Sequence, residues 1–214
     1  MTATGDLPFA CACGQVAGTI ANASPKRGDY VVCHCIDCQS LPLYLGCAER
    51  VLDEYGGTAI YQARTGDITI DQGADKLAAL HLTDQPTLRW YAGCCDTPLF
   101  NSYANGRIPF TSTLLANCGT AVDAMLGEAR GHLFVKDAVG DTRDLKTLSM
   151  ARVMPRVIVR MAKDILSGAR RRNPLFDPGT FAPIAAPRRL NPAERAEVKG
   201  LVDNYHERHD ETVP

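Results

Sequence analysis

The sequence contains no apolar run long enough to cross a bilayer, so no contact with a membrane is expected. Its first ten residues lack a basic start followed by an apolar stretch, and they do not resemble a secretory signal peptide. A formal net charge of −1 over 214 residues gives the whole molecule little attraction for polyanions, so nucleic acid is not an expected partner. No internal repeat is found. We therefore expect a cytoplasmic globular protein with one sizeable domain, with or without an extension.

Cysteine, by contrast, is abundant and clustered. The chain has nine cysteines. Seven of them fall into three tight groups, which are Cys11 and Cys13, then Cys33, Cys35 and Cys38, then Cys94 and Cys95. In a reducing compartment, clustered thiols indicate metal binding or catalysis rather than disulfides. Cys47 and Cys118 stand alone, and we interpret them as buried small apolar residues.

The central group has the spacing C-x-C-x-x-C over residues 33–38. One turn of chain with this spacing can direct three sulfurs at one point. Three thiolates leave the fourth position of a tetrahedral Zn²⁺ open, which is typical of a catalytic or ligand-binding zinc. Water or the thiol of a small molecule suits that position. His34 lies between two of the cysteines, and we expect its ring to point away from them.

The first and third groups are too far apart in sequence to form one local site, but they meet if two strands or loops lie side by side. Four thiolates from Cys11, Cys13, Cys94 and Cys95 would make a closed, structural zinc site. Adjacent residues of a strand point to opposite faces, so both Cys94 and Cys95 bind only if the chain turns there, which the preceding glycine permits. Asp96 or another group is the alternative fourth ligand. One or two zinc ions are expected in total.

Most of residues 1–150 predict short strands, so we expect a mainly β (α+β) fold. The candidates are residues 15–20, 30–33, 58–62, 67–70, 77–82, 87–91 and 132–135. The intervals are too short for βαβ crossovers, which predicts a mostly antiparallel sheet. Residues 36–47 begin as a helical turn that Pro42 limits, and residues 114–126 predict a short helix.

Residues 151–214 predict a helical extension to this β domain. Apolar residues at helical spacing predict an amphipathic helix over 155–171, with Pro155 in its first turn and its arginines in water. Its apolar side chains should lie against the β domain or a second subunit, and they are Val157, Ile158, Met161 and Ile165. This face makes an oligomer through the C-terminal helices one expectation.

A connector with four prolines follows over residues 173–189 and is expected to be pinned to a surface. The sequence from Asn191 to Glu194 then has the pattern of a helix start, with an asparagine cap and an acid three residues later. That helix should run to about His209. We expect His206 and His209 to be solvated rather than to bind metal.

Three motifs of the chain resemble the glutathione-dependent formaldehyde-activating enzyme family, which includes centromere protein V. They are Cys11-Ala-Cys13-Gly14-Gln-Val16, Cys33-His-Cys35-Ile-Asp-Cys38-Gln39 and Cys95-Asp-Thr97-Pro98-Leu99. The resemblance covers about residues 9–103. It implies a zinc-bearing antiparallel structure called a β-tent. It also implies a structural zinc on the first and third motifs and a labile zinc at an active site on the central motif.

The third motif departs from the family pattern C-x-x-C-G. Ala92 stands at the first cysteine and Asp96 at the glycine, while Cys95 matches the second cysteine. The adjacent Cys94 is therefore a candidate substitute ligand.

The reaction implied by the resemblance is condensation of formaldehyde with glutathione to S-hydroxymethylglutathione, the reverse of a carbon–sulfur lyase reaction. Cys33, Cys35 and Cys38 would carry the catalytic zinc, and glutathione or another small thiol would be the partner. The alternative is a non-catalytic, zinc-stabilised module that binds a thiol or docks its basic helix on an acidic partner. A third hypothesis uses the central cysteines for redox chemistry or metal storage.

Overall fold

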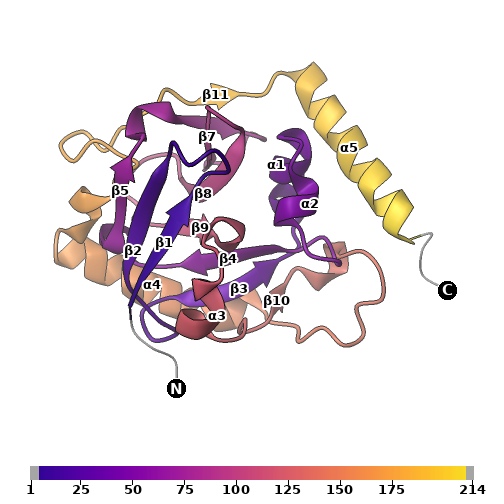
Figure 1. The fold of residues 1–214 in the computed structure, drawn as a ribbon, viewed down its shortest axis with the longest axis horizontal. Coiled ribbons are helices and arrows are strands. Elements are labelled where there is room, and N and C mark those ends of the chain that lie inside the picture. Colours follow the sequence, from indigo (N-terminus) through magenta and orange to yellow (C-terminus); the bar gives the residue numbers. More distant parts are fainter. Residues whose placement is uncertain (1–4, 211–214) are drawn as a thin grey trace.

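Two β-sheets pack together around a shared apolar core (Figure 1). The computed structural model describes residues 5–210. The smaller sheet has the order β1-β2-β5 and is antiparallel throughout. Its strands are β1 (Gly5–Ala10), β2 (Ala17–Ala23) and β5 (Ile68–Gln72).

The larger sheet has eight strands in the order β10-β3-β4-β9-β8-β7-β6-β11. They are β3 (Asp29–Cys33), β4 (Thr58–Gln62), β6 (Leu77–His81), β7 (Thr87–Ala92), β8 (Thr97–Tyr103), β9 (Thr111–Leu114), β10 (His132–Leu133) and β11 (Arg188–Arg189). Neighbouring strands are antiparallel except at the edges, where β10 and β11 run parallel to β3 and β6. The mainly β, mostly antiparallel prediction is confirmed, and the two parallel edges make the sheet mixed.

Aromatic side chains from both sheets fill the core. Phe9 on β1 meets Phe100 on β8 edge to face, with ring centroids 5.1 Å apart. Trp90 on β7 is fully buried and donates its indole N–H to Ser102 Oγ over 2.8 Å. Phe176, from the proline-rich connector, packs on Trp90 at 5.7 Å. The connector is thus held against the core, as expected.

Two strands that the sequence pattern did not predict contain proline. β1 lies at the edge of the small sheet, where the missing N–H of Pro8 costs no ladder bond. β8 is central, but its pairing with β7 shifts register between Trp90 and Tyr91, beside Pro98. This irregularity accommodates the proline.

Residues 5–210 contain five α-helices. They are α1 (Ile36–Tyr44), α2 (Ala48–Val51), α3 (Ala121–Leu126), α4 (Met150–Leu166) and α5 (Pro192–Asp210). Short 3₁₀ turns, η1 to η5, occur at Thr65–Asp67, Ala74–Lys76, Leu115–Asn117, Val135–Asp137 and Ala169–Arg172. The helix expected at 114–126 is instead the end of β9, then η3 and α3. No helix among the described residues is long and apolar enough to cross a membrane.

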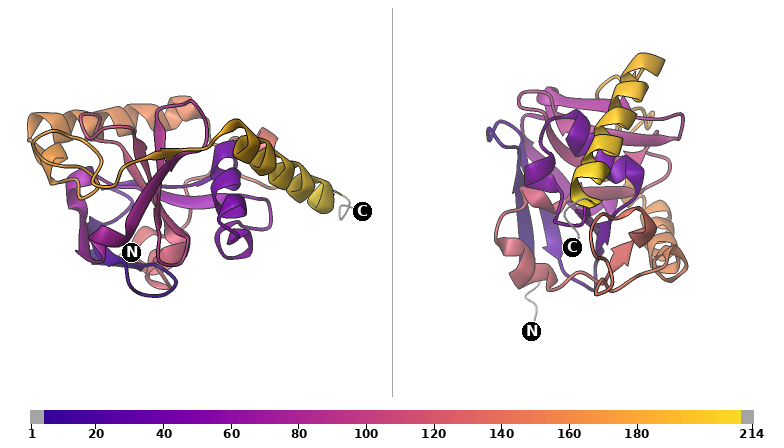
Figure 2. Two further views of the ribbon diagram at one scale, coloured as in Figure 1. Left: turned by 90° about the horizontal axis from the view of Figure 1, so that it is seen from above. Right: turned by 90° about the vertical axis from the view of Figure 1, so that its right-hand side faces the viewer.

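The C-terminal helix α5 lies beside α1 (Figures 1 and 2). Its predicted start is confirmed. Asn191 Oδ1 accepts the N–H of Glu194 over 3.0 Å, and Glu194 Oε2 accepts the N–H of Asn191 over 2.8 Å. Leu41 of α1 and Val198 of α5 share an apolar cluster that fixes the helix pair.

Helix α4 differs from the prediction in position and in burial. It spans 150–166 rather than 155–171, so Pro155 lies inside it instead of in its first turn. Val153 and Val157, one helical turn apart, are buried in the core, and this tertiary contact extends the helix toward its N-terminus. Ile158 and Ile165 are 56% and 42% exposed, so they do not pack on the β domain as expected. Whether a second subunit covers them stays a prediction.

The arginines of α4 do not all face water, which corrects a second expectation. Asp29 on β3 is fully buried and binds Arg130, Arg156 and Arg160. Arg156 Nε lies 2.9 Å and Arg160 a terminal nitrogen 2.6 Å from its oxygens. Burial acts to raise the pKa of Asp29, but the hydrogen bond and charge of Arg160 and the other two guanidinium groups outweigh it and lower the pKa. A buried carboxylate therefore ties α4 to β3.

Candidate metal centres and an adjoining cleft

The first cysteine cluster joins the turn after β1 to the turn after β7. The four sulfurs of Cys11, Cys13, Cys94 and Cys95 lie within 4.8 Å of one another. Cys13 Sγ is 3.5 Å from Cys11 Sγ and 3.4 Å from that of Cys94, and Cys94 Sγ is 3.9 Å from both Cys11 Sγ and Cys95 Sγ. Four sulfurs each 2.3 Å from a tetrahedral zinc would be about 3.8 Å apart. The separations are therefore compatible with zinc.

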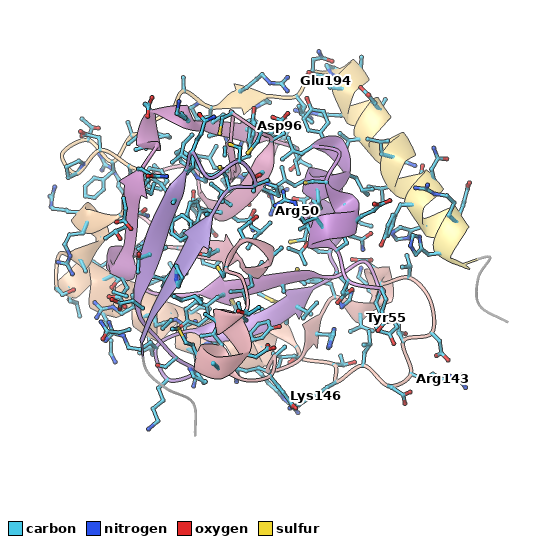
Figure 3. The ribbon with its side chains drawn as sticks, in the orientation of Figure 1. Arg50, Tyr55, Asp96, Arg143, Lys146 and Glu194 are labelled. Carbon is cyan, nitrogen blue, oxygen red and sulfur yellow. The ribbon has the colours of Figure 1, made fainter. Side chains whose placement is uncertain are left out.

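The tight turn between β7 and β8 explains how adjacent cysteines reach one point. Asp96, labelled in Figure 3, adopts a left-handed conformation with φ of 51°. Aspartate tolerates this region better than most residues, so it can take the place of a glycine. Asp96 is not part of the four-sulfur group, and Cys94 is. The geometry thus favours Cys94 over Asp96 as the fourth ligand.

A hydrogen-bond relay orients this cluster. Thr97 Oγ1 accepts the N–H of Ala12 over 3.0 Å and a guanidinium N–H of Arg50 over 3.3 Å. Its own hydrogen is left to point at Cys95 Sγ, 3.1 Å away. Burial acts to raise the pKa of Cys95, but hydrogen bonds from Thr97 and Cys13 prevail and lower the pKa to about 6. Hydrogen bonds that reach a sulfur through Thr97 in this way stabilise a thiolate that can bind a metal ion.

The second cluster lies at the N-terminus of α1. The sulfurs of Cys33, Cys35 and Cys38 lie within 4.8 Å of one another, and those of Cys33 and Cys35 are 3.4 Å apart. Pro42 lies within α1 and cannot bond the carbonyl of Cys38. The hydroxyl of Thr58 donates to that carbonyl instead, over 3.0 Å. The helix therefore tolerates its proline and runs further than the single turn expected.

Mutual hydrogen bonds and the charge of Arg89 shift the pKa values of these three thiols in different directions. Hydrogen bonds from Cys33 and Cys35, with the charge of Arg89, hold the pKa of Cys38 well below its usual value although burial opposes them. For Cys35 a hydrogen bond from Cys33 lowers the pKa, but its bond to Cys38 and burial raise the pKa to about 12. The pKa of Cys33 is raised by its hydrogen bonds to Cys35 and Cys38 and by burial. The charge of Arg89 thus favours the thiolate form of Cys38.

Arg89 on β7 is a candidate site residue that the sequence pattern did not reveal. Its side chain is buried, and Nη1 lies 3.9 Å from Cys38 Sγ and donates to Asn101 over 2.8 Å. Nη2 lies 3.2 Å from the carboxylate of Asp37. Three thiolates and a divalent cation carry a net charge of −1, and the Arg89 guanidinium offsets this charge while it also pairs with Asp37. A cysteine triad with this counter-charge fits a zinc ion.

A cleft of about 520 Å³ opens beside the second cluster. All three cysteines line it, together with Arg89 and Asn101. Among the described residues, no fourth cysteine, histidine or acidic ligand atom joins the three sulfurs. A fourth coordination position would therefore face the cleft, whereas the first cluster supplies four protein ligands of its own.

Polar side chains around the cleft include one without a partner. Gln62 is 7% exposed, and its Oε1 accepts no hydrogen bond. Lys136 and Phe134 lie on the segment after β10 that borders the cleft.

Gln39 ties that segment to the central motif, since its Nε2 donates to the carbonyls of His34 and Asp137 over 2.6 Å each.

The remaining candidates from the sequence are also placed. Cys118 is buried in the core as interpreted, while Cys47 is only half-buried and belongs to neither sulfur group. His34 points away from the thiols, as expected. His206 was expected to be solvated, and this expectation is wrong. Its Nε2 lies 2.6 Å from Gln39 Oε1. His209 packs on Tyr205 with ring centroids 4.1 Å apart.

A comparison with protein-family models identifies the family of this chain. Residues 4–186 match a family of unknown function (DUF6151), which spans most of the chain, both cysteine clusters and α4. The chain belongs to that family. No curated protein matches the sequence.

Proposed function

We propose that this DUF6151 protein binds zinc at both cysteine clusters and acts on a small thiol adduct at the second one. The observation that carries the proposal is the contrast between the clusters. One offers four sulfurs, and the other offers three at the wall of a cleft. A closed site suits a structural ion, and a site with one position open to a cleft suits a substrate.

Cys33, Cys35 and Cys38 would hold the ion of the second site. When bound there, zinc would keep the sulfur of a substrate as a thiolate. The proposed reaction joins that sulfur to an aldehyde carbon, the carbonyl oxygen taking a proton, or runs in reverse. Arg89 would balance the charge of the thiolates, and it is held in place by Asn101 and Asp37.

The polar lining supports a peptidic thiol such as glutathione. Gln62 Oε1 is a buried acceptor without a donor, and an amide N–H of a peptide would satisfy it. Lys136 has an exposed ammonium group at the border of the cleft, suited to a carboxylate. Glutathione carries both groups, and the three motifs resemble those of a family that uses it with formaldehyde.

The test is formation of S-hydroxymethylglutathione, measured by exchange NMR above the uncatalysed background. Zinc-loaded wild-type protein should accelerate the exchange, and Cys35→Ser should abolish the acceleration while the protein stays folded. Cys118→Ser is the matched control and should keep it. A background rate for the fully metallated wild type refutes turnover. Glutathione titration of that same protein would then test the alternative, a module that binds thiols without reaction.

A further inference from the structure

A third group of metal-ligating atoms lies behind the second cysteine cluster. Ligand atoms of His34, Asp53 and His132 lie within 4.8 Å of one another. His34 comes from the central motif, Asp53 from the turn after α2, and His132 from the edge strand β10. His34 is fully buried, and the other two are half-buried.

Neighbouring backbone groups orient the His34 ring. Its Nδ1 lies 3.1 Å from the carbonyl oxygen of Tyr55, a residue labelled in Figure 3. A carbonyl only accepts, so Nδ1 carries the hydrogen and Nε2 keeps its lone pair. Nε2 faces His132 Nδ1 at 2.9 Å. A ring N–H bonded to a carbonyl is the arrangement that fixes a metal-binding histidine in other sites.

The carboxylate of Asp53 is fixed in the same way. Its Oδ1 accepts the N–H groups of Tyr55 and Gly57 over 3.0 and 2.6 Å. Oδ2 lies beside Gly57, where an added Cβ would come within 2.7 Å of Oδ2 and 2.6 Å of His34 Cε1. Only glycine lets the carboxylate and the ring approach this closely.

We propose that His34, Asp53 and His132 form a third metal site, one that takes a divalent transition ion such as Zn²⁺ or Co²⁺. Two imidazoles and a carboxylate are a ligand set that such ions accept. Two nitrogens about 2.05 Å from an ion are about 2.9 Å apart at a right angle around it, and about 3.4 Å apart at the tetrahedral angle. The two ring nitrogens lie within that range.

This site is independent of the thiol chemistry proposed above. Its ligands are nitrogen and oxygen, and no cysteine belongs to the group. His34 nevertheless stands between two ligands of the second cluster, so the two sites share the backbone of residues 33–35. An ion at the third site would therefore constrain the backbone between two ligands of the second cluster.

The experiment counts metal ions on the full chain by mass spectrometry after zinc loading and removal of free metal. Three groups predict three ions for the wild type. His132→Ala and Asp53→Asn should each bind one fewer and keep the zinc at both cysteine clusters. Asp53→Asn retains an oxygen for the two backbone N–H groups, so its fold should be the less disturbed. His209→Ala, a histidine outside the group, is the control and should keep all three.

Cobalt identifies which ion is lost. Protein with its cysteine clusters filled by Zn²⁺ should take up one further Co²⁺ without the intense near-ultraviolet absorption of cobalt–thiolate bonds, and both variants should lose that uptake. A wild type that holds no third ion overturns the proposal, and the histidine pair is then a hydrogen bond alone. A third ion that persists in Asp53→Asn and His132→Ala overturns it equally. Should His132→Ala fail to fold, the wild-type count and Asp53→Asn still decide.

Discussion

Replacing an exposed cysteine should destabilise this protein more than replacing a buried one. Cys13 is exposed and has little packing to lose, whereas Cys118 is 4% exposed within the main core. Packing alone would therefore make Cys118→Ser the costlier change, by about 1–3 kcal/mol for a buried hydroxyl. If the first cluster holds zinc, the order reverses.

The size of the effect follows from the length of chain that the cluster closes. Cys13 and Cys94 are 81 residues apart. A cross-link over a loop of that length removes about 4.5 kcal/mol of entropy from the unfolded state, which is an upper limit. Three ligands remain after one is lost, so we expect Cys13→Ser to cost about 2–4 kcal/mol. For a chain of this size that is a fall in Tm of roughly 5–15 °C.

The free energy of unfolding of each variant is measured by urea unfolding followed by circular dichroism, with and without a chelator. The chelator should lower the stability of the wild type and of Cys118→Ser, and it should change Cys13→Ser much less. Two results would refute the reasoning. One is a smaller loss for Cys13→Ser than for Cys118→Ser, and the other is a wild-type stability that the chelator leaves unchanged.

Three further outcomes are expected. Arg89→Met removes the cation beside Cys38, so it should lower the affinity of the second cluster for zinc about 10–100-fold. Competition with a chelating dye measures this affinity, and an unchanged value contradicts the role of Arg89. Asp29→Asn should cost about 2–3 kcal/mol at neutral pH, since its three arginine partners are only partly buried. The pKa of Asp29 is lower in the folded state than its usual value of 3.8, so its full contribution to stability is present above pH 3.8 and is lost as the pH falls through the folded-state pKa. A stability difference between wild type and Asp29→Asn that does not shrink in acid would contradict this. Gln39→Leu leaves the carbonyls of His34 and Asp137 without a donor, so it should lower the free energy of unfolding by about 1–3 kcal/mol, measured by thermal unfolding. A stability equal to that of the wild type would show that water replaces the amide.

The sequence predicted several short strands that turn residues bound, and it missed those that tertiary contacts create. Thr58–Gln62 is the predicted strand without change. β8 was missed although it is central, because Pro98 argues against a strand unless a register shift is foreseen. α4 starts five residues earlier than predicted, because burial of Val153 outweighs the preference of Pro155 for a first turn.

The cysteine groups were recognisable because each carries its spacing in the sequence. The residues around them were not, since each comes from a distant element and is an ordinary residue where it stands. Arg89 is one of many arginines until β7 places it beside Cys38, and Gln62 is unremarkable until its acceptor faces the cleft. His132 lies 98 residues from His34 and has no motif of its own. Local spacing can therefore predict ligands but not their counter-charges or orienting groups.

The two cysteine groups occupy different places in the fold. The four-sulfur group joins the turn after β1 to the turn after β7, so a metal ion held there would stabilise the fold. The three-sulfur group lies at the end of β3, where α1 begins, and faces the cleft. Gln39 joins its motif to the segment at the edge of that cleft and, through His206, to α5. Because α5 lies beyond residue 186, the end of the family match, this last contact comes from a part of the chain that the family model does not cover. His206 of α5 is therefore linked to the edge of the cleft through the hydrogen bonds of one glutamine.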